Sequence, residues 1–393
     1  SEKHSNRFKP KKQDPISEIH ITLKDDISPV IGTNIEISLS DIYSVSINKR
    51  DSLLEFATVI LGVAGVIGGV FLIILATKSS CPFVYVKVGD TYQFAGELYP
   101  GILTENMQID DYLPLGNYQG TKQNYSIKVT NELKEIQHTD FIQLLEIEHS
   151  KDVTVLLDKH GNTHTFSNII SPTSVQVDNE KVSNKKPVLA KDNTSYLFNS
   201  RLNNSSSKRK LELRFNKPLQ AEDAKLFLTV KNSMWLDYVF GKFNEQFGSY
   251  YAQFQKDQQN APAEKSTAWM NEQNIPLSVY LKTEKGWELV DRINVVGPMS
   301  SRDIVVPLNL SKIEGEEVII KLETGFMFWE VDKVALDFSE NLPVIVNNLQ
   351  PFRAIDQDGN DVLKFLTEKD DQDLVQPNIG DQVYVSFKSK SEE

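Results

Sequence analysis

The chain has 393 residues, of which 40% are hydrophobic and 24% are charged, and its net charge is −12. This composition is that of a folded protein of two or three domains and fits neither a disordered chain nor a disulfide scaffold. The single cysteine, Cys81, excludes an internal disulfide and a cysteine-based zinc site. After residue 80, 33 Lys and Arg face 45 Asp and Glu, and this acidity without a long basic stripe argues against nucleic-acid binding.

The first fifty residues predict a tail and a small β module. Residues 1–17 are polar and are expected to form a flexible tail. Within 18–50, apolar and polar residues alternate in three short runs, at Ile19–Leu23, Ile35–Leu39 and Val45–Ile47. Three short strands make a small sheet, so we expect this module to need a partner.

An uncharged hydrophobic run, Phe56–Thr77, is the strongest single signal in the chain. As a helix it would span about 33 Å, close to the roughly 30 Å of a hydrocarbon core. A signal-peptide core begins nearer to a chain's start, and a buried helix of a soluble domain rarely lacks a polar face over this length. We therefore predict a transmembrane helix over 53–77.

The predicted membrane helix has a face of small residues, formed by Gly62, Gly65, Gly68 and Gly69. The spacing of Gly65 and Gly69 permits close approach of a second helix. Lys and Arg are denser before the helix than after it, which places the N-terminus in the cytoplasm. Lipidation of Cys81 is an alternative anchor, which the neighbouring Lys78 disfavours.

The alternating pattern continues beyond this helix. Phe83–Val88 and Thr91–Ala95 flank a Gly-Asp turn and predict a hairpin. A polar stretch at 180–210 is the candidate linker. Further strands are predicted at Tyr125–Thr130, Phe141–Ile147, Val153–Leu157, Leu211–Phe215, Ala224–Val230, Leu277–Leu281, Trp287–Val290, Asp303–Pro307, Glu317–Leu322 and Phe328–Leu336.

Many short strands at such intervals are typical of a sandwich. We therefore predict a mainly β protein: one transmembrane helix and a β-sandwich ectodomain of jelly-roll type with an inserted amphipathic helix. The predicted domains are a β domain at 81–190, the β-sandwich at 211–345 and a C-terminal β segment at 346–393.

The inserted helix carries an aromatic stripe, because large apolar residues recur every three or four positions between 235 and 254. We expect this stripe to pack on the sandwich. The alternative is a face for a partner or a membrane surface, formed by Trp235, Phe243, Phe247 and Phe254.

Three segments, Lys78–Tyr85, Tyr92–Gly101 and Thr130–His138, resemble a family of largely uncharacterised bacterial envelope proteins. In that family a hydrophobic segment precedes a Ser-Cys-Pro-Phe strand and a β ectodomain. The resemblance implies a place in the cell envelope and brings no established activity. Some members look like exported lipoproteins, which would put the N-terminus outside the cytoplasm.

Residues 211–340 separately resemble jelly-roll modules of the carbohydrate-binding or discoidin type. The resemblance lies in Gly286–Val290, Asp303–Leu308 and Trp329–Val334, and it implies a fold without fixing a function. Candidate stacking residues for a glycan are Trp269, Trp287 and Trp329, each of which core packing would also explain.

Two clusters contain histidine beside other possible metal ligands or general acids and bases. Glu135 and His138 have the spacing of helical metal ligands, beside Glu132 and Asp140, but their setting is strand-rich and an exposed polar edge is expected. The segment from His160 to His164 lies across a predicted turn at Lys159–Asn162 and lacks further ligands in the sequence, so a plain hairpin turn is expected.

A third cluster partly matches the pattern of a calcium-binding loop, with oxygen ligands at alternating positions and a glycine at the bend. It lacks a distal Glu at the right spacing, and Asp358-Gly359 is also a common hairpin turn. The candidate Ca²⁺ ligands are Asp356, Asp358, Asn360 and Asp361.

No phosphate-binding glycine loop and no Gly-x-Ser-x-Gly motif occurs in the sequence. We therefore expect a non-enzymatic, membrane-anchored binding or scaffolding subunit of a bacterial envelope complex, with the bulk of the chain outside the cytoplasm. Its expected partners are the membrane and other envelope proteins. A glycan-binding protein is the second hypothesis, and a metal-assisted or acid–base hydrolase the third.

Overall fold

The computed structural model describes residues 19–23, 42–47, 82–99, 108–116, 124–133, 136–178, 180–181, 188–200, 207–247, 250, 253–254, 256–257, 260–370 and 372–390. The chain divides into two units, Ser1–Ala76 and Thr77–Glu393. In the first unit, β1 (Ile19–Leu23) pairs antiparallel with β2 (Ile42–Ile47). These are two of the three strands predicted for this module; the third, at 35–39, lies outside the described residues.

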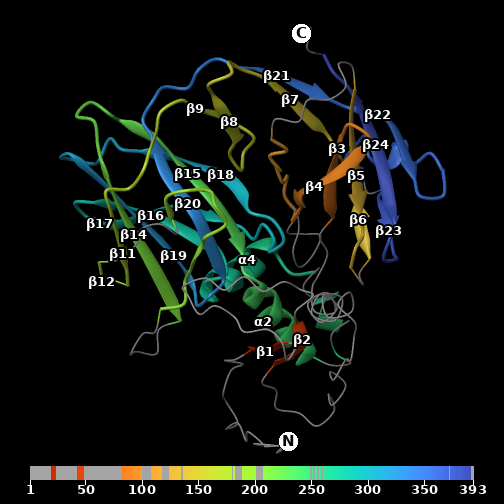
Figure 1. Ribbon diagram of the computed structural model, residues 1–393, viewed down its shortest axis with the longest axis horizontal. Coiled ribbons are helices and arrows are strands. Elements are labelled where there is room, and N and C mark those ends of the chain that lie inside the picture. Colours follow the sequence, from red (N-terminus) through yellow and green to blue (C-terminus); the bar gives the residue numbers. More distant parts are fainter. Residues whose placement is uncertain are drawn as a thin grey trace, which may run out of the picture. The chain divides into compact units, whose positions relative to one another are not determined.

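No helix in the described ranges is long and apolar enough to cross a membrane. The predicted transmembrane helix at 53–77 lies outside these ranges, together with Gly62, Gly65 and Gly69. The second unit is mainly β, as predicted, and consists of antiparallel sheets (Figure 1).

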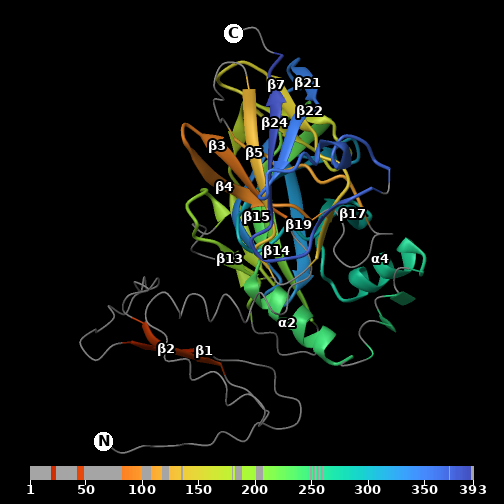
Figure 2. The same cartoon turned by 90° about the vertical axis from the view of Figure 1, so that its right-hand side faces the viewer.

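One sheet of the second unit has five strands in the order β22-β24-β5-β3-β4. All neighbours are antiparallel, and β24, near the end of the chain, pairs with β5, which in turn pairs with β3 (Figure 2). The predicted β domain and the predicted C-terminal segment therefore share one sheet and one hydrophobic core. The strands are β3 (Phe83–Val88), β4 (Thr91–Glu97), β5 (Asn124–Thr130), β22 (Pro351–Asp356) and β24 (Gln382–Lys388).

Two short ribbons extend this part of the unit. β7 (Leu144–Glu148) pairs with β21 (Ile345–Leu349), and β6 (Gln137–Thr139) pairs with β23 (Leu374–Gln376). A single 3₁₀ turn, η5 (Leu363–Phe365), follows β22.

Two further sheets are built from the middle of the chain. The six-stranded sheet has the order β12-β11-β14-β19-β16-β17, and in the other β10-β20-β15-β18 form a path that β13 joins beside β20. The bounds are β10 (Ile169–Ile170), β11 (Ser174–Val177), β12 (Glu180–Lys181), β13 (Tyr196–Leu197), β14 (Lys208–Asn216), β15 (Asp223–Asn232), β16 (Leu277–Thr283), β17 (Gly286–Ile293), β18 (Arg302–Asn309), β19 (Glu317–Gly325) and β20 (Trp329–Asp337).

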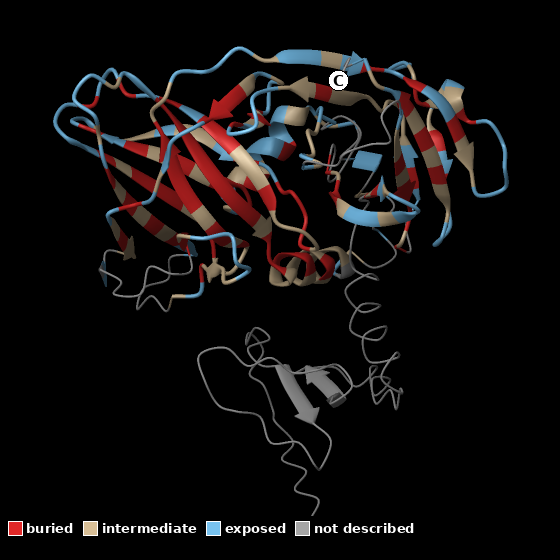
Figure 3. Ribbon diagram, turned by 45° about the horizontal axis from the view of Figure 1, so that its top comes forward, coloured by how far each residue is buried: buried red, intermediate tan, exposed pale blue. Residues whose placement is uncertain are grey.

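Alternation explains how these two sheets share a core. Leu211, Leu213 and Phe215 of β14 point to one side of their strand, and they belong to the same buried cluster as Leu226 and Leu228 of β15. Figure 3 shows buried residues concentrated along these strands. The other side of β15 is covered by the hairpin of β8 (Thr154–Leu157) and β9 (Thr163–Phe166), which forms a smaller buried cluster there.

The predicted linker is partly a core element. Val188 and Phe198 lie within 180–210 and are buried in the large core, while Tyr196 packs against it. The few apolar residues of this stretch are irregularly spaced among polar ones and give no periodic signal, which is why composition alone suggested a linker.

The segment between β15 and β16 carries the helices α2 (Met234–Glu245) and α4 (Ala263–Glu272), and some of the residues between them lie outside the described ranges. Ser233 caps α2, since its side chain accepts a hydrogen bond from the N–H of Leu236. The predicted aromatic helix is thus shorter than expected, and Phe247 and Phe254 lie beyond its end.

Candidate functional site

The outer face of the five-stranded sheet carries aromatic rings around one lysine. Val84, Val86 and Ile127 point into the core, so the residues between them point to the opposite side. The register aligns five outward positions in one row across β4, β3, β5, β24 and β22: Phe94, Tyr85, Lys128, Tyr384 and Ile355. We call Phe83, Tyr85, Tyr92, Phe94, Lys128 and Tyr384 the aromatic face.

Lys128 lies among the rings of this face. Its Nζ is 4.2 Å from the ring centroid of Tyr85 and 5.9 Å from that of Tyr92. Tyr85 contacts Phe94 at 5.4 Å, and Phe94 contacts Phe83 at 5.8 Å, in tilted arrangements that suit ring quadrupoles. The π faces therefore provide a favourable environment for the ammonium group.

Tyr92 ties distant strands of the face together. Its hydroxyl lies 2.9 Å from Oγ of Ser126, and its ring contacts Tyr384 edge-on at 5.5 Å. The strands β4 and β24 are third neighbours, about 14 Å apart at the usual strand spacing. The two rings must therefore lean toward each other across β3 and β5, which gathers the aromatic side chains over the middle of the sheet.

Glu132 holds Tyr85 in place. The Tyr85 hydroxyl donates to Oε1 of Glu132, and Oγ1 of Thr130 donates to the same oxygen at 2.9 Å. Burial, reinforced by this hydrogen bond and by the charge of Glu132, raises the pKa of Tyr85 well above its ordinary value of 10. Tyr85 is therefore a neutral donor with its hydrogen already committed.

The aromatic face is rich in cations on a chain that is acidic overall. In the described part of the chain, no Asp or Glu forms an ion pair with Lys128. Lys87 pairs with Tyr92 and Arg353 with Ser386, which places two more exposed cations on the same side. Glu97, at the other end of β4, has its carboxylate engaged elsewhere, because it accepts a hydrogen bond from the N–H of Met299 at 2.8 Å.

These residues suit binding better than catalysis. The face offers ring surfaces, a lysine without an acidic partner and a hydroxyl pair. Tyr92 and Ser126 hold two hydroxyl hydrogens for one mutual hydrogen bond, so one hydrogen is available to a ligand.

The three tryptophans predicted as a ligand platform lie apart. Trp329 is fully buried, and its Nε1 donates to the carbonyl of Ile275 at 2.8 Å. Trp269 packs against Phe243 within the helical insertion, with ring centroids 5.3 Å apart. Only Trp287 lies on a sheet surface, so a platform of all three residues is not formed.

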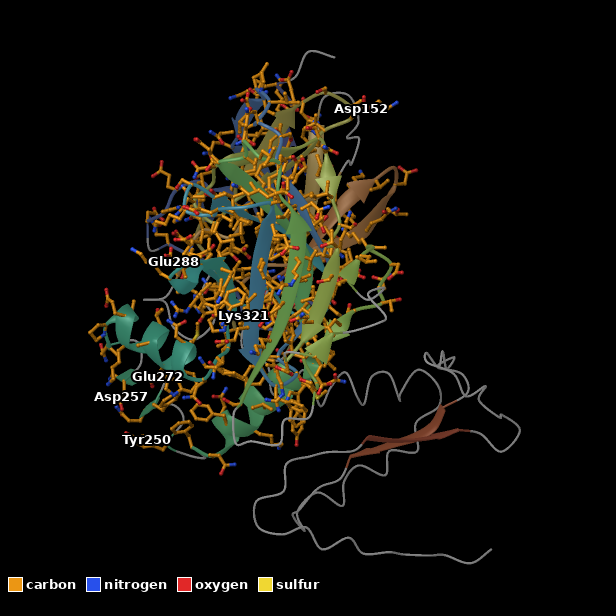
Figure 4. All side chains as sticks on the ribbon, turned by 90° about the vertical axis from the view of Figure 1, so that its left-hand side faces the viewer. Asp152, Tyr250, Asp257, Glu272, Glu288 and Lys321 are labelled. Carbon is orange, nitrogen blue, oxygen red and sulfur yellow. The ribbon has the colours of Figure 1, made fainter. Side chains whose placement is uncertain are left out.

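Trp287 belongs to a second polar and aromatic surface, the outer side of the six-stranded sheet. Nζ of Lys282 and Nζ of Lys321 lie 5.3 and 5.0 Å from its ring centroid. Lys321 also lies 4.0 Å over the ring of Tyr280 and pairs with Glu323 at 3.1 Å. Figure 4 labels Lys321 on this side of the molecule. Unlike Lys128, this lysine already has a carboxylate partner.

The aromatic stripe packs mostly on itself. Phe243 contacts Phe247 at 5.3 Å and Phe254 at 6.3 Å, and the rings of Phe247 and Phe254 stack on each other. Trp235 instead stacks on Tyr238. The residues predicted as a partner face therefore form two groups, and the rings of the larger group are half-buried against one another and against Trp269.

The predicted calcium residues form a closed turn after β22. Oδ1 of Asp356 accepts hydrogen bonds from the N–H groups of Asp358 and Asn360, at 2.9 and 2.8 Å. Asp361 caps the next turn by accepting from the N–H of Leu363. Among the described residues, no three or more His, Cys, Asp or Glu side chains gather to hold a metal ion. The hydrogen bonds within the turn account for the residue pattern.

The two histidine-containing clusters also have local partners. His138 pairs with Asp373 at 3.1 Å, and Asp140 accepts from the N–H of Asp370. Glu135 lies outside the described residues, and Glu132 accepts the hydrogen bond from Tyr85 of the aromatic face. His164 bonds Asp158 at 3.0 Å rather than facing His160, so the predicted turn is closed by this carboxylate.

The aromatic face was missed by the sequence analysis, although a signal for it exists. Phe83, Tyr85, Tyr92 and Phe94 occupy alternate positions of a predicted hairpin, which puts their rings on one side. The pairing of β5 with β24, which adds Lys128 beside Tyr384, joins segments more than 250 positions apart and has no local signal. No protein-family model matches the chain, and a search of curated proteins found no match.

Proposed function

We propose that this protein is a non-enzymatic, membrane-anchored binding subunit of the bacterial cell envelope. The aromatic face is its binding surface, and the segment Phe56–Thr77 is its anchor. The single observation that supports binding most strongly is Lys128, which lies among aromatic rings without an ion-pair partner in the described chain. A half-exposed cation that needs no internal partner is free to meet an external one.

The proposal includes the finer architecture and location expected from the sequence. The shared core of the six-stranded sheet and the sheet of β10, β13, β15, β18 and β20 supports a β-sandwich of jelly-roll type. The second unit lies outside the cytoplasm, where it meets other envelope proteins. Membership of the uncharacterised envelope family is supported by its three motifs, whose residues Tyr85, Phe94 and Glu132 meet in the aromatic face.

Site-specific photo-cross-linking in intact cells tests this function. A photoreactive side chain replaces Phe94, which is 37% exposed, in the full-length protein made by its natural host. The matched control carries it at Leu219, which is 79% exposed in the turn between β14 and β15. We expect a discrete adduct from position 94 and none from position 219. Equal, diffuse labelling at both positions would refute a binding role for this face.

Glycan binding through Trp287 is a second candidate function. It is favoured by the position of the half-buried Trp287 on the outer side of the six-stranded sheet, with Lys282 and Lys321 around its ring and Lys321 also over the ring of Tyr280. Quenching of tryptophan fluorescence by neutral oligosaccharides would support it if Trp287→Phe abolished the response. A response that survives this substitution would place the ligand elsewhere.

A further inference from the structure

We propose that the ligand of the aromatic face is an acidic polysaccharide whose sugar rings stack on Phe94 and Tyr384 while a carboxylate pairs with Lys128. This inference rests on the proposed binding function and names its ligand class. It starts from two features that occur together: exposed ring surface and a cation without an internal partner.

The ring surface selects a ligand with flat, weakly polar faces. Phe94 is the most exposed ring of the face, and the half-buried Tyr384 lies in the same row on the far side of Lys128. The C–H groups of a pyranose carry slight positive charge and favour the negative face of an aromatic ring. The free hydrogen of the Tyr92–Ser126 pair supplies a donor to a sugar hydroxyl.

The cations select a ligand with negative charge. The central Lys128 lies over the rings of Tyr85 and Tyr92 and has no ion-pair partner among the described residues, whereas Lys321 on the six-stranded sheet is neutralised by Glu323. A carboxylate placed beside Lys128 would form a charge-assisted hydrogen bond while the ammonium keeps its contact with Tyr85. Lys87 and Arg353 lie in the neighbouring row of the same face, on β3 and β22, and add positive charge on one side of the Lys128 row.

The spacing of the cations separates a polysaccharide from a nucleic acid. Lys87 and Arg353 lie on β3 and β22, third neighbours in the sheet and about 14 Å apart. A nucleic-acid strand carries a charge about every 3.4 Å and needs a denser row of cations, above all on a chain of net charge −12. An acidic polysaccharide, whose charges are separated by neutral parts of its sugar rings, matches this wide spacing of cations better than a nucleic acid does.

Isothermal titration of the detergent-solubilised full chain with a hexamer of galacturonate tests the inference. The neutral controls are the fully methyl-esterified hexamer and a hexamer of glucose, and (dT)₂₀ represents nucleic acid. We expect binding of the acid form and at least tenfold weaker binding of its ester. Equal binding of acid and ester, no binding of the acid, or tighter binding of (dT)₂₀ would overturn the inference.

Variants then locate the ligand. Lys128→Gln and Phe94→Ala should each weaken binding of the acid form about tenfold. The matched control is Lys364→Gln, which removes an exposed lysine 4.6 Å over the ring of Phe365 in the same unit. Unchanged affinity in Lys128→Gln, with a folded protein by circular dichroism, would overturn the inference. If the cross-link at position 94 persists while galacturonate fails to bind, the binding function stands and only the ligand class is wrong.

Discussion

Nη1 of Arg302 donates to Oδ1 of Asp111 at 2.5 Å, although 191 positions separate the two residues. Both side chains are largely buried, and Nη2 of Arg302 also donates to the carbonyl of Glu97. Oδ2 of Asp111 accepts from the N–H of Tyr99. These bonds connect the segment after β4 to β18. The part of the Tyr92–Gly101 segment that contains Glu97 and Tyr99 therefore has a structural role, whereas Tyr92 and Phe94 belong to the aromatic face.

Gly297 shows how closely these parts approach each other. Its φ of +99° lies in a region that side chains rarely adopt. A Cβ here would also lie 2.4 Å from Oε2 of Glu97. Substitution of Gly297 by alanine would therefore strain the backbone and separate the two segments.

Arg302→Met should lower the free energy of unfolding by about 3–5 kcal/mol, because it leaves the Asp111 carboxylate buried without its partner. Denaturant unfolding of the full chain followed by tryptophan fluorescence measures this. Arg214→Met is the control, since Arg214 pairs with Glu317 at a solvent-exposed position and its loss should cost less than about 1 kcal/mol. Equal effects of the two substitutions would contradict the structural role of Arg302.

The turn between β8 and β9 predicts a pH dependence of stability. Burial disfavours the Asp158 carboxylate, but hydrogen bonds from His164, from the side chain and N–H of Asn162 and from the N–H of His160 outweigh it and lower its pKa to about 2. A lowered pKa contributes stability above the ordinary value of 3.8, and this contribution is lost as the pH falls toward 2.

Asp158→Asn should therefore be less stable at pH 7 and should show a shallower loss of stability between about pH 4 and pH 2. Denaturation midpoints across this range provide the measurement. Asp152→Asn, an exposed carboxylate in the turn before β8, should retain the slope of the unmodified protein. A slope in Asp158→Asn as steep as in the control would argue against the role assigned to this carboxylate.

Trp329→Phe should destabilise the fold by about 2–4 kcal/mol, because it leaves a cavity and removes the donor to the Ile275 carbonyl. The same substitution at Trp287, on a sheet surface, should cost below about 1 kcal/mol. Comparable losses at both positions, measured by thermal and denaturant unfolding, would be inconsistent with their different burial.

The anchor proposed for Phe56–Thr77 predicts a change in fractionation. Replacing both Val66 and Ile67 with Asp places two charges mid-segment, each disfavouring insertion by about 3 kcal/mol. The variant should leave the carbonate-resistant membrane fraction of the natural host, whereas Leu219→Asp should remain in it. Retention of the double variant in that fraction would exclude this segment as the anchor.

Local pattern predicted the strands well and their partners poorly. The hairpin of β3 and β4 follows from alternation around Gly89-Asp90, because both strands and their turn lie in one short window. The pairing of β7 with β21 does not follow from alternation. Alternation determines which residues lie on each face of a strand, but it does not determine which strand lies beside it.

The candidate site was harder to predict for the same reason. Trp287 and Trp329 look alike as tryptophans near strand starts, and only the packing of the two sheets distinguishes the half-buried ring of Trp287 from the fully buried ring of Trp329. The sequence around Asp356 suits a calcium ligand and a turn residue equally well. The hydrogen bonds that its carboxylate accepts from Asp358 and Asn360, which favour the turn, are visible only in the structure.

The most direct test of the binding function combines the photoreactive group at position 94 with Lys128→Gln in intact cells. If the aromatic face binds its partner through the lysine, the yield of the position-94 adduct should fall at least severalfold in the variant, while protein level and membrane fractionation stay unchanged. An undiminished yield of the same adduct would show that Lys128 does not take part, and it would contradict the account of the aromatic face given above.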